Sequence, residues 1–266
     1  MSAVEAVALV AAAAAGGAMN AIAGGGTIVT FPTLVLLGHP AIEANATSTV
    51  ALLPGAVASL AGYRSEVAAH RAWLKTLFLP SLAGGAVGSY LLLRTPERTF
   101  AELAPLLVLF ATLLFGLQGA VGRWTRRRAA AAGAAQPLDP PPLPSSPVRW
   151  AVALLFQFGV AVYGGYFGAG IGILMLAVLG FLGLGDIHAM NGLKNFFGVC
   201  INGVAAAYFI ARGAVDWPVA LVMIAGAVLG GYGGARFARS IGQSRARAAV
   251  IVIGLLVTAI LFWQRS

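Results

Sequence analysis

Two glycine-rich stretches decide how this chain folds. Gly24-Gly-Gly-Thr27 interrupts the apolar run Ala3–Leu37, and Gly168-Ala-Gly-Ile-Gly172 interrupts the apolar run Ala151–Leu184. Glycine costs a helix about 1 kcal/mol relative to alanine, so these clusters predict breaks in two membrane-length helices. In lipid, a broken helix is tolerated only where protein or a water-filled cavity satisfies the freed backbone groups. Paired breaks at matching positions of two halves are typical of the binding site of a transporter.

The composition is that of a membrane protein. Of the 266 residues, 59% are hydrophobic and only 9% are charged, whereas soluble domains carry about 25% charged residues. The formal net charge is +9. The basic residues fall mostly in short connections between apolar runs, which is how they orient membrane proteins, so this charge does not predict a nucleic-acid partner. They are Arg64, Arg71, Lys75, Arg94, Arg98, Arg123, Arg126, Arg127, Arg128, Arg149, Arg236, Arg239, Arg245 and Arg247.

The lengths of the apolar segments predict the fold class. A helix needs about 20 apolar residues to cross the hydrocarbon of a lipid bilayer. The chain offers eight candidate segments in two sets of four: 4–37, 46–63, 75–93, 103–122, 150–183, 192–211, 217–238 and 247–264. The predicted fold is therefore an all-α integral membrane protein with about eight transmembrane helices in two homologous four-segment repeats. The first segment of each repeat is broken at its glycines.

A segment of different composition, residues 123–149, separates the repeats 1–122 and 150–266. It contains Arg126-Arg-Arg128, an alanine run and Pro140-Pro-Pro142. Because it has little apolar content to pack and too much proline for a helix, we predict a flexible linker. Its positive charge favours the cytoplasmic side. Eight crossings would place both chain termini on that side as well.

The two halves align without a gap at a constant offset of 146 residues. Each has a glycine break, then an asparagine before a span, then a Gly-Gly-x-x-Gly pattern in the next span. The pairs are Gly24/Gly170, Gly26/Gly172, Asn45/Asn191, Gly84/Gly230, Gly85/Gly231 and Gly88/Gly234. This order indicates an internal duplication. An even number of crossings per half would make the repeats parallel, and an odd number would make them inverted. Because Thr27–Leu37 extends only about 16 Å as a helix, a re-entrant half-helix would give the odd number.

Two polar segments predict where a substrate binds. Asn45-Ala-Thr-Ser-Thr49 and Asn191-Gly-Leu-Lys-Asn195 each open a span after a short turn. Asparagine is a favoured N-cap residue, and a helix N-terminus presents free N–H groups and a partial positive charge. If these helix starts face the glycine breaks, they form an anion site. The alternative is that both asparagines cap helices at the membrane interface while Lys194 extends to the lipid headgroups.

The anion-site hypothesis defines a set of candidate residues. An ionisable group within a span is functional by default, so Lys194 is the strongest candidate. Glycines of the breaks and polar groups of the two helix starts complete the set. The predicted substrate-binding residues are Gly24, Gly25, Gly26, Thr27, Asn45, Thr47, Ser48, Gly170, Gly172, Asn191, Lys194 and Asn195.

The sequence predicts no catalytic residues, no metal and no cofactor. Its one cysteine, Cys200, excludes an internal disulfide and a cysteine-ligated cluster. His39 and Glu43 lie four residues apart, but Pro40 lies between them and no third ligand is near in sequence, which favours a solvated turn. An intramembrane enzyme would need a nucleophile–base pair or a metal cluster at membrane depth, and three histidines and one cysteine argue against it. Because no Walker A pattern occurs, we do not expect ATP hydrolysis.

Three motifs give the chain a family resemblance. Gly24-Gly-Gly-Thr27 with the following Phe31-Pro32, the turn Asn45-Ala-Thr-Ser48 and the second-half Gly168-Ala-Gly-Ile-Gly172 resemble the sulfite exporter TauE/SafE family of membrane permeases. The resemblance covers nearly the whole chain. It implies two homologous halves and the movement of small sulfur-containing anions, such as sulfite and organosulfonates, across the bacterial plasma membrane. The sequence departs from the family at the first-half turn, where many members have a Thr-Asn-Lys-type sequence. Here the Lys-Asn pair occurs only in the second half, as Lys194-Asn195.

The leading hypothesis is therefore a secondary transporter for a small anion, and a sulfur-containing anion is the favoured substrate. A carboxylate transporter is one alternative. A membrane scaffold or assembly protein without transport activity is another, and it would need no polar site at the midplane. The sequence leaves open whether protons are the coupling ion, whether the chain forms a homodimer and in which direction the substrate moves.

Overall fold

A computed structural model describes residues 1–23, 25–131, 147–182, 184, 186–241 and 243–263. Within these ranges the chain forms helices and no strands. The first half contains α1 (Ala3–Ala23), α2 (Thr27–Leu36), α3 (Ala41–Ala61), α4 (Arg64–Ala69), α5 (Arg71–Arg94) and α6 (Glu97–Ala131). The second half contains α7 (Pro147–Tyr166), α8 (Ile171–Phe181), α9 (Ile187–Ala211), α10 (Trp217–Ile241) and α11 (Gln243–Trp263).

The described helices have the lengths and the apolar outer surface that are typical of a membrane protein. Five stretches are long and apolar enough to cross a bilayer by length and composition, namely Ala3–Asn20, Ala41–Ala61, Arg71–Arg94, Glu97–Trp124 and His188–Ala211. Large apolar side chains also face outward. Leu155 and Leu229, for example, expose 73% and 70% of their surface. A soluble monomer rarely exposes wide apolar patches, so lipid is the environment that suits this surface.

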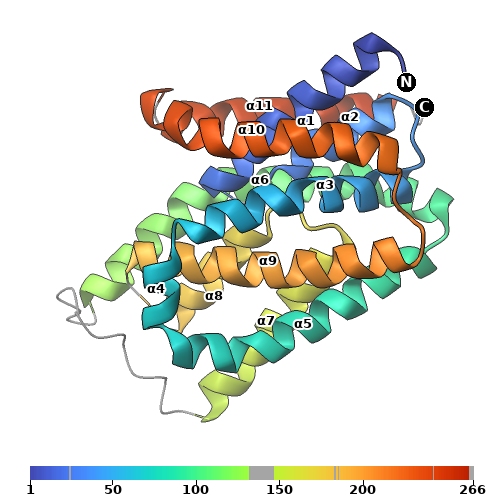
Figure 1. The fold of residues 1–266 in the computed structure, drawn as a ribbon. Coiled ribbons are helices and arrows are strands. Elements are labelled where there is room, and N and C mark those ends of the chain that lie inside the picture. Colours follow the sequence, from blue (N-terminus) through green and yellow to red (C-terminus); the bar gives the residue numbers. More distant parts are fainter. Residues whose placement is uncertain (24, 132–146, 183, 185, 242, 264–266) are drawn as a thin grey trace.

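Each half begins with a long helix followed by a short one. α1 ends at Ala23 and α2 begins at Thr27, and the chain turns back between them (Figure 1). The first turn of α2 lies against the middle of α1, since a Cβ added to Gly16 would lie 2.8 Å from Thr30 Cγ2. α2 is therefore a half-helix that packs beside the helix before it.

In the second half, α7 ends at Tyr166 and α8 begins at Ile171. Gly168 and Gly170 in this connection have φ angles of 83° and 81°. Glycine adopts this left-handed region without the steric cost that other residues meet there. The backbone conformation, as well as helix propensity, thus requires glycine at these two positions.

Close helix contacts depend on glycine in both halves. α1 packs along α10, and α5 packs along α7. A Cβ on Gly230 of α10 would overlap the carbonyl oxygen of Ala14 in α1. Likewise, a Cβ on Gly88 of α5 would overlap the carbonyl oxygen of Val162 in α7. Small residues at such contacts let two membrane helices approach closely.

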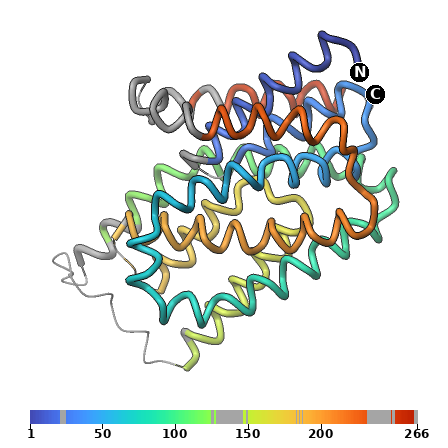
Figure 2. The backbone as a smooth tube through the Cα atoms, in the orientation of Figure 1, coloured from blue at the N-terminus to red at the C-terminus, as the bar shows by residue number. Residues whose placement is uncertain are grey.

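The start of α1 and the end of α11 lie at one end of the bundle, while α4, the end of α6 and the start of α7 lie at the other, as the labels of Figure 1 and the tube of Figure 2 show. The prediction that the linker and both termini share one side is therefore wrong. The prediction assumed that each glycine-broken segment crosses the membrane once. Because α2 folds back along α1, the chain changes direction once more in this half than the prediction allowed. The middle of the predicted linker, residues 132–146, lies outside the described residues.

The linker prediction also placed the end of the preceding helix too early. α6 continues to Ala131, so residues 123–131 of the predicted linker are helical. Alanine and arginine are among the strongest helix formers, and this stretch is rich in both. The prolines that disfavour helix begin only later, at Pro137.

Candidate binding cavity

A cavity of about 50 Å³ lies where the first residues of α2 and α8 meet α3 and α9. Roughly 10–15 Å³ by this measure holds one water molecule. The cavity therefore has room for a few waters or for one small ion. Its walls are mostly small or polar. The lining residues are Asn20, Thr27, Thr49, Leu52, Leu53, Ala56, Ser59, Gly168, Ile171, Gly172, Lys194, Asn195, Gly198, Val199 and Asn202.

The N-termini of the two half-helices lie at this cavity. Thr27 is the first residue of α2, and Ile171 and Gly172 are the first residues of α8. In α2 the N–H groups of Ile28 and Val29 donate to the carbonyl oxygens of Gly25 and Gly26, and in α8 the Ile173 N–H donates to the Gly170 carbonyl oxygen. What both helix ends bring to the cavity is the partial positive charge of the helix dipole. Two such ends at one cavity favour an anion over a cation.

Lys194 brings a full positive charge to the same cavity. Its side chain is 4% exposed, and its Nζ donates a hydrogen bond to Asn191 Oδ1 at 3.2 Å. Among the described residues, no Asp or Glu pairs with it, and no acidic residue lines the cavity. A buried charge is stable only when it is paired or hydrogen-bonded. The bond to Asn191 Oδ1 supplies a hydrogen-bond partner but no opposite charge, so an anion in the cavity would neutralise Lys194.

The cavity brings together one part of the predicted site. Thr27, Gly172, Lys194 and Asn195 line it, and Asn191 supports Lys194 as its hydrogen-bond acceptor. These residues come from α2, α8 and α9.

The glycines next to the half-helices have packing roles. The Gly26 N–H donates to Asn20 Oδ1 at 3.0 Å, and a Cβ on Gly25 would overlap the ring of Phe115. Gly170 is the N-cap residue of α8. Gly24, which was also predicted to bind substrate, lies outside the described residues.

Of the polar residues of the first predicted helix start, Thr49 lines the cavity, but Asn45, Thr47 and Ser48 do not. Asn45 Nδ2 donates to the carbonyl oxygen of Tyr166 at 3.1 Å. The hydroxyls of Ser48 and Thr30 are hydrogen-bonded at 2.6 Å, and Thr47 Oγ1 accepts from the Asp216 N–H at 3.0 Å. These side chains join helices to one another.

The prediction that Asn45 and Asn191 are helix N-caps is wrong, because both helices begin earlier. α3 starts at Ala41 after Pro40, and the Glu97 carboxylate accepts hydrogen bonds from the N–H groups of its first two residues, Ala41 and Ile42. α9 starts after Asp186, whose carboxylate accepts from the N–H groups of His188 and Ala189. The two asparagines therefore lie about one turn inside their helices.

The predicted set of substrate-binding residues omitted several residues that line the cavity, although the sequence carries a signal for them. Thr49 and Ser59 lie on one face of α3 with the other lining residues of that helix, and Asn202 lies two turns after the predicted Asn195 on α9. Polar residues that recur at helical spacing within an apolar span share one face. Asn20 is likewise a polar residue close to the end of the apolar helix α1.

The fold and the cavity define a class: a multi-pass α-helical membrane protein with a partly polar cavity between its helices. The chain belongs to the sulfite exporter TauE/SafE family, whose sequence model matches residues 9–261. The chain is therefore a member of a family of membrane transporters.

Curated relatives cover almost the whole chain. A probable membrane transporter protein of Haemophilus influenzae is 26% identical over 251 residues, which are 93% of this chain and 91% of that protein. The probable membrane transporter protein ORF9 of a Sinorhizobium species is 26% identical over 90% of this chain and 85% of its own length. The probable membrane transporter protein YfcA of Escherichia coli K12 is 25% identical over 93% of this chain and 86% of its own length. No solved structure matches the chain.

Proposed function

We propose that the chain is a secondary transporter that binds a small sulfur-containing anion, such as sulfite or an organosulfonate, in the cavity at Lys194. The observation that carries this proposal is one buried lysine, without a carboxylate partner among the described residues, at a cavity where two half-helices begin. Half-helix N-termini that point at an anionic group are a recurring device of transporters.

The chemistry of the walls supports a substrate with several oxygen atoms. The hydroxyl of Thr27 and the amides of Asn195 and Asn202 offer hydrogen-bond donors at the cavity, whereas the Thr49 hydroxyl donates to the Asn45 carbonyl oxygen at 2.8 Å. A sulfite or sulfonate group has three oxygens that accept bonds from several directions. Hydrogen bonds to such a charged group are about twice as strong as neutral ones.

We further propose that the two halves are inverted repeats. The first residues of α3, α5 and α6 are Ala41, Arg71 and Glu97, and each lies 146 residues before the first residue of α9, α10 and α11, respectively. The helix contacts follow the same correspondence. α1 of the first half packs against α10 of the second, and its counterpart α7 packs against α5, the counterpart of α10.

The directions of the helices support inversion over parallel repeats. Gly192 near the start of α9 lies against Tyr63 after the end of α3, while Asp216 after α9 contacts Thr47 near the start of α3. α3 and α9 are thus antiparallel, as Figure 1 shows. Inverted repeats around a central cavity suit alternating access, in which one half moves against the other.

Reconstitution into proteoliposomes tests the proposed substrate. Purified protein should exchange sulfite or an organosulfonate faster than liposomes without protein, and sulfate and a carboxylate such as acetate serve as comparison anions. Exchange of carboxylates alone would replace the sulfur-anion proposal with the carboxylate alternative. If none of these anions is bound or exchanged by a folded protein, the scaffold hypothesis is favoured.

A smaller effect is expected from the hydroxyl at the start of α2. Thr27→Val keeps the shape of the side chain and removes one neutral hydrogen bond, which contributes about 1 kcal/mol, so the affinity for the transported anion should fall about five-fold. Titration of the anion into the purified variant measures this. Thr76 of α5 is half-buried and lies away from the cavity, and its hydroxyl donates to the Ala72 carbonyl oxygen at 2.9 Å. Thr76→Val is therefore the matched control and should bind the anion as the parent does. Equal affinity for both variants would remove Thr27 from the site.

The charge distribution supports an orientation in the membrane. The end of the bundle with α4 carries more of the described basic side chains than the opposite end, namely Arg64, Arg71, Lys75, Arg123 and Arg127. The opposite end carries Arg94, Arg98 and Arg212. Lys and Arg accumulate on the cytoplasmic side of membrane proteins. We infer that the α4 end faces the cytoplasm of a bacterial inner membrane and that both termini face outward.

Cysteine labelling tests this orientation. In a Cys200→Ser background, a membrane-impermeant maleimide added to intact cells should label Ser2→Cys and leave Ser65→Cys unlabelled. Both positions are exposed, one at each end of the bundle. Inside-out vesicles should give the reverse pattern. Labelling of Ser65→Cys in intact cells would contradict the orientation.

A further inference from the structure

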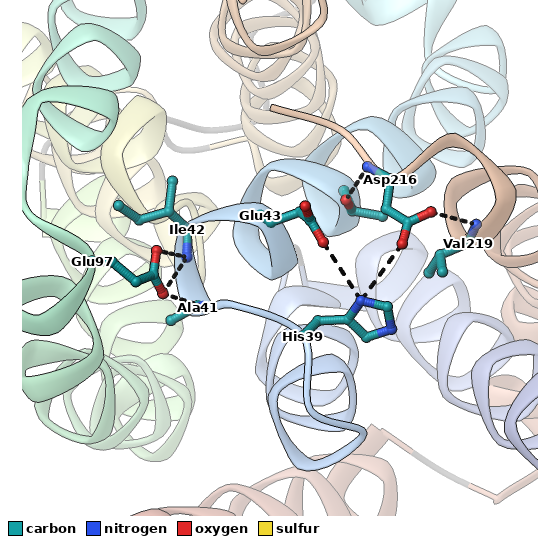
Figure 3. A network of polar contacts seen from close by, with 8 residues as sticks. His39, Ala41, Ile42, Glu43, Glu97, Asp216 and Val219 are labelled. Carbon is teal, nitrogen blue, oxygen red and sulfur yellow. Dashed lines mark hydrogen bonds and ion pairs between the residues drawn. The ribbon is translucent and has the colours of Figure 1, made fainter. Parts of the chain in front are cut away.

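We propose that His39, Glu43 and Asp216 form a binding site for a divalent transition-metal ion, with Zn²⁺ as the best match. The three side chains point toward one another at the end of the bundle that holds the chain termini (Figure 3). One ligand atom from each lies within 4.8 Å of the other two. This site is separate from the cavity at Lys194, and it does not depend on the proposed substrate.

The distances fit metal ligands better than hydrogen bonds. His39 Nδ1 is 3.6 Å from Glu43 Oε1 and 3.6 Å from Asp216 Oδ2. A nitrogen–oxygen hydrogen bond is shorter, about 2.7–3.2 Å. Two ligands that bind one zinc ion at about 2.1 Å with tetrahedral angles lie about 3.4 Å apart. The imidazole nitrogen is therefore spaced from both carboxylates as if they shared one ion.

The surrounding structure fixes the Asp216 carboxylate. Its Oδ1 accepts a hydrogen bond from the Val219 N–H at 3.3 Å, and the Asp216 N–H donates to Thr47 Oγ1 at 3.0 Å. Asp216 thus caps α10 with one oxygen and turns the other, Oδ2, toward His39. Hydrogen bonds that orient a ligand in this way strengthen metal sites.

The charge and the ligand types select the metal. Two carboxylates face one imidazole, and no described Lys or Arg forms an ion pair with either acid. A divalent cation would balance this negative charge. An imidazole ligand favours zinc and similar transition metals over Mg²⁺ and Ca²⁺, which prefer oxygen ligands alone. The side chains are 23%, 41% and 26% exposed, so a fourth position remains open to water.

The sequence does not predict this site, because only two of the three ligands, His39 and Glu43, lie near each other along the chain. The third ligand, Asp216, comes from the other half of the chain, between α9 and α10. His39 lies just before α3 and Glu43 in its first turn, while Asp216 lies just before α10. A bound ion would therefore link the first half of the chain to the second. We expect the metal to stabilise the contact between the two halves at this end.

Metal titration of the full-length protein in detergent tests the proposal. After treatment with a chelator and its removal, Zn²⁺ alone is titrated by calorimetry, and Co²⁺ is added separately to read the ligand geometry from its visible absorption. We expect saturable binding of one ion per chain and an increase in the thermal unfolding temperature with Zn²⁺. His39→Ala and Asp216→Asn should each weaken Zn²⁺ binding at least about ten-fold, the range seen when groups that support a metal site are changed.

Two features of the variants separate metal binding from folding. Asparagine caps a helix as well as aspartate, so Asp216→Asn preserves the cap of α10 while it removes the charged ligand. His188→Ala alters an exposed histidine on the start of α9 and should bind Zn²⁺ as the parent does. Absence of saturable Zn²⁺ binding by the parent protein would overturn the proposal. So would His39→Ala and Asp216→Asn proteins that bind Zn²⁺ as tightly as the parent.

Discussion

Replacement of Lys194 by alanine is expected to weaken binding of the transported anion by a hundred-fold or more. The lysine is buried at the cavity, and removal of one partner of a buried, charge-paired contact costs about 3–5 kcal/mol. Each 1.4 kcal/mol is a ten-fold change in the dissociation constant. Isothermal titration of sulfite or an organosulfonate into parent and variant protein, together with counterflow in proteoliposomes, measures the loss.

Two further variants make this test specific. Lys194→Arg retains the charge but adds a planar, larger group, so it should also impair binding in a cavity of about 50 Å³. Lys75→Ala removes an exposed lysine at the α4 end and should leave binding unchanged. If Lys194→Ala protein binds and exchanges every tested anion as the parent does, Lys194 does not hold the substrate. The proposed site would then be wrong even if transport is confirmed.

Replacement of Gly88 by alanine is expected to destabilise the protein, because the contact between α5 and α7 leaves no room for a Cβ. The added Cβ would overlap the carbonyl oxygen of Val162 and lie 2.7 Å from the Tyr166 nitrogen. These are backbone atoms, so relief requires α5 and α7 to separate. Overpacking of this kind costs about 1–3 kcal/mol, occasionally more. Thermal unfolding of the detergent-solubilised protein, followed by gel filtration, measures the effect.

Gly116→Ala is the matched control, because no atom lies within 4 Å of the Cβ it would add on α6. It should leave the unfolding temperature unchanged or raise it slightly, since alanine favours helix over glycine. Gly230→Ala should behave like Gly88→Ala at the contact between α10 and α1. If the Gly88→Ala and Gly116→Ala proteins unfold at the same temperature, α5 and α7 can move apart without loss of stability.

The resemblance to the family could be recognised from local motifs, and the family match agrees with it. The helical character of the described chain was also predictable, because apolar runs of membrane length leave the backbone no hydrogen-bond partners except its own. Helix starts were harder to predict. Asparagine is a good cap in isolation, but a carboxylate from Glu97, which follows α5, binds the N–H groups at the start of α3 and moves that start to Ala41. No local pattern contains this distant partner.

The amino-acid sequence by itself determined where the chain is apolar, where glycine disfavours helix and which residue carries a charge within a span, since each depends on neighbours along the chain. Tertiary structure decided which side chains meet. Thr27, Gly172 and Lys194 line one cavity because α2 folds back along α1 and because α8 begins beside α9. His39 meets Asp216 because α3 lies against α10. These contacts join residues far apart in the sequence, and helix packing, which depends on the shape of whole faces, is what brings them together.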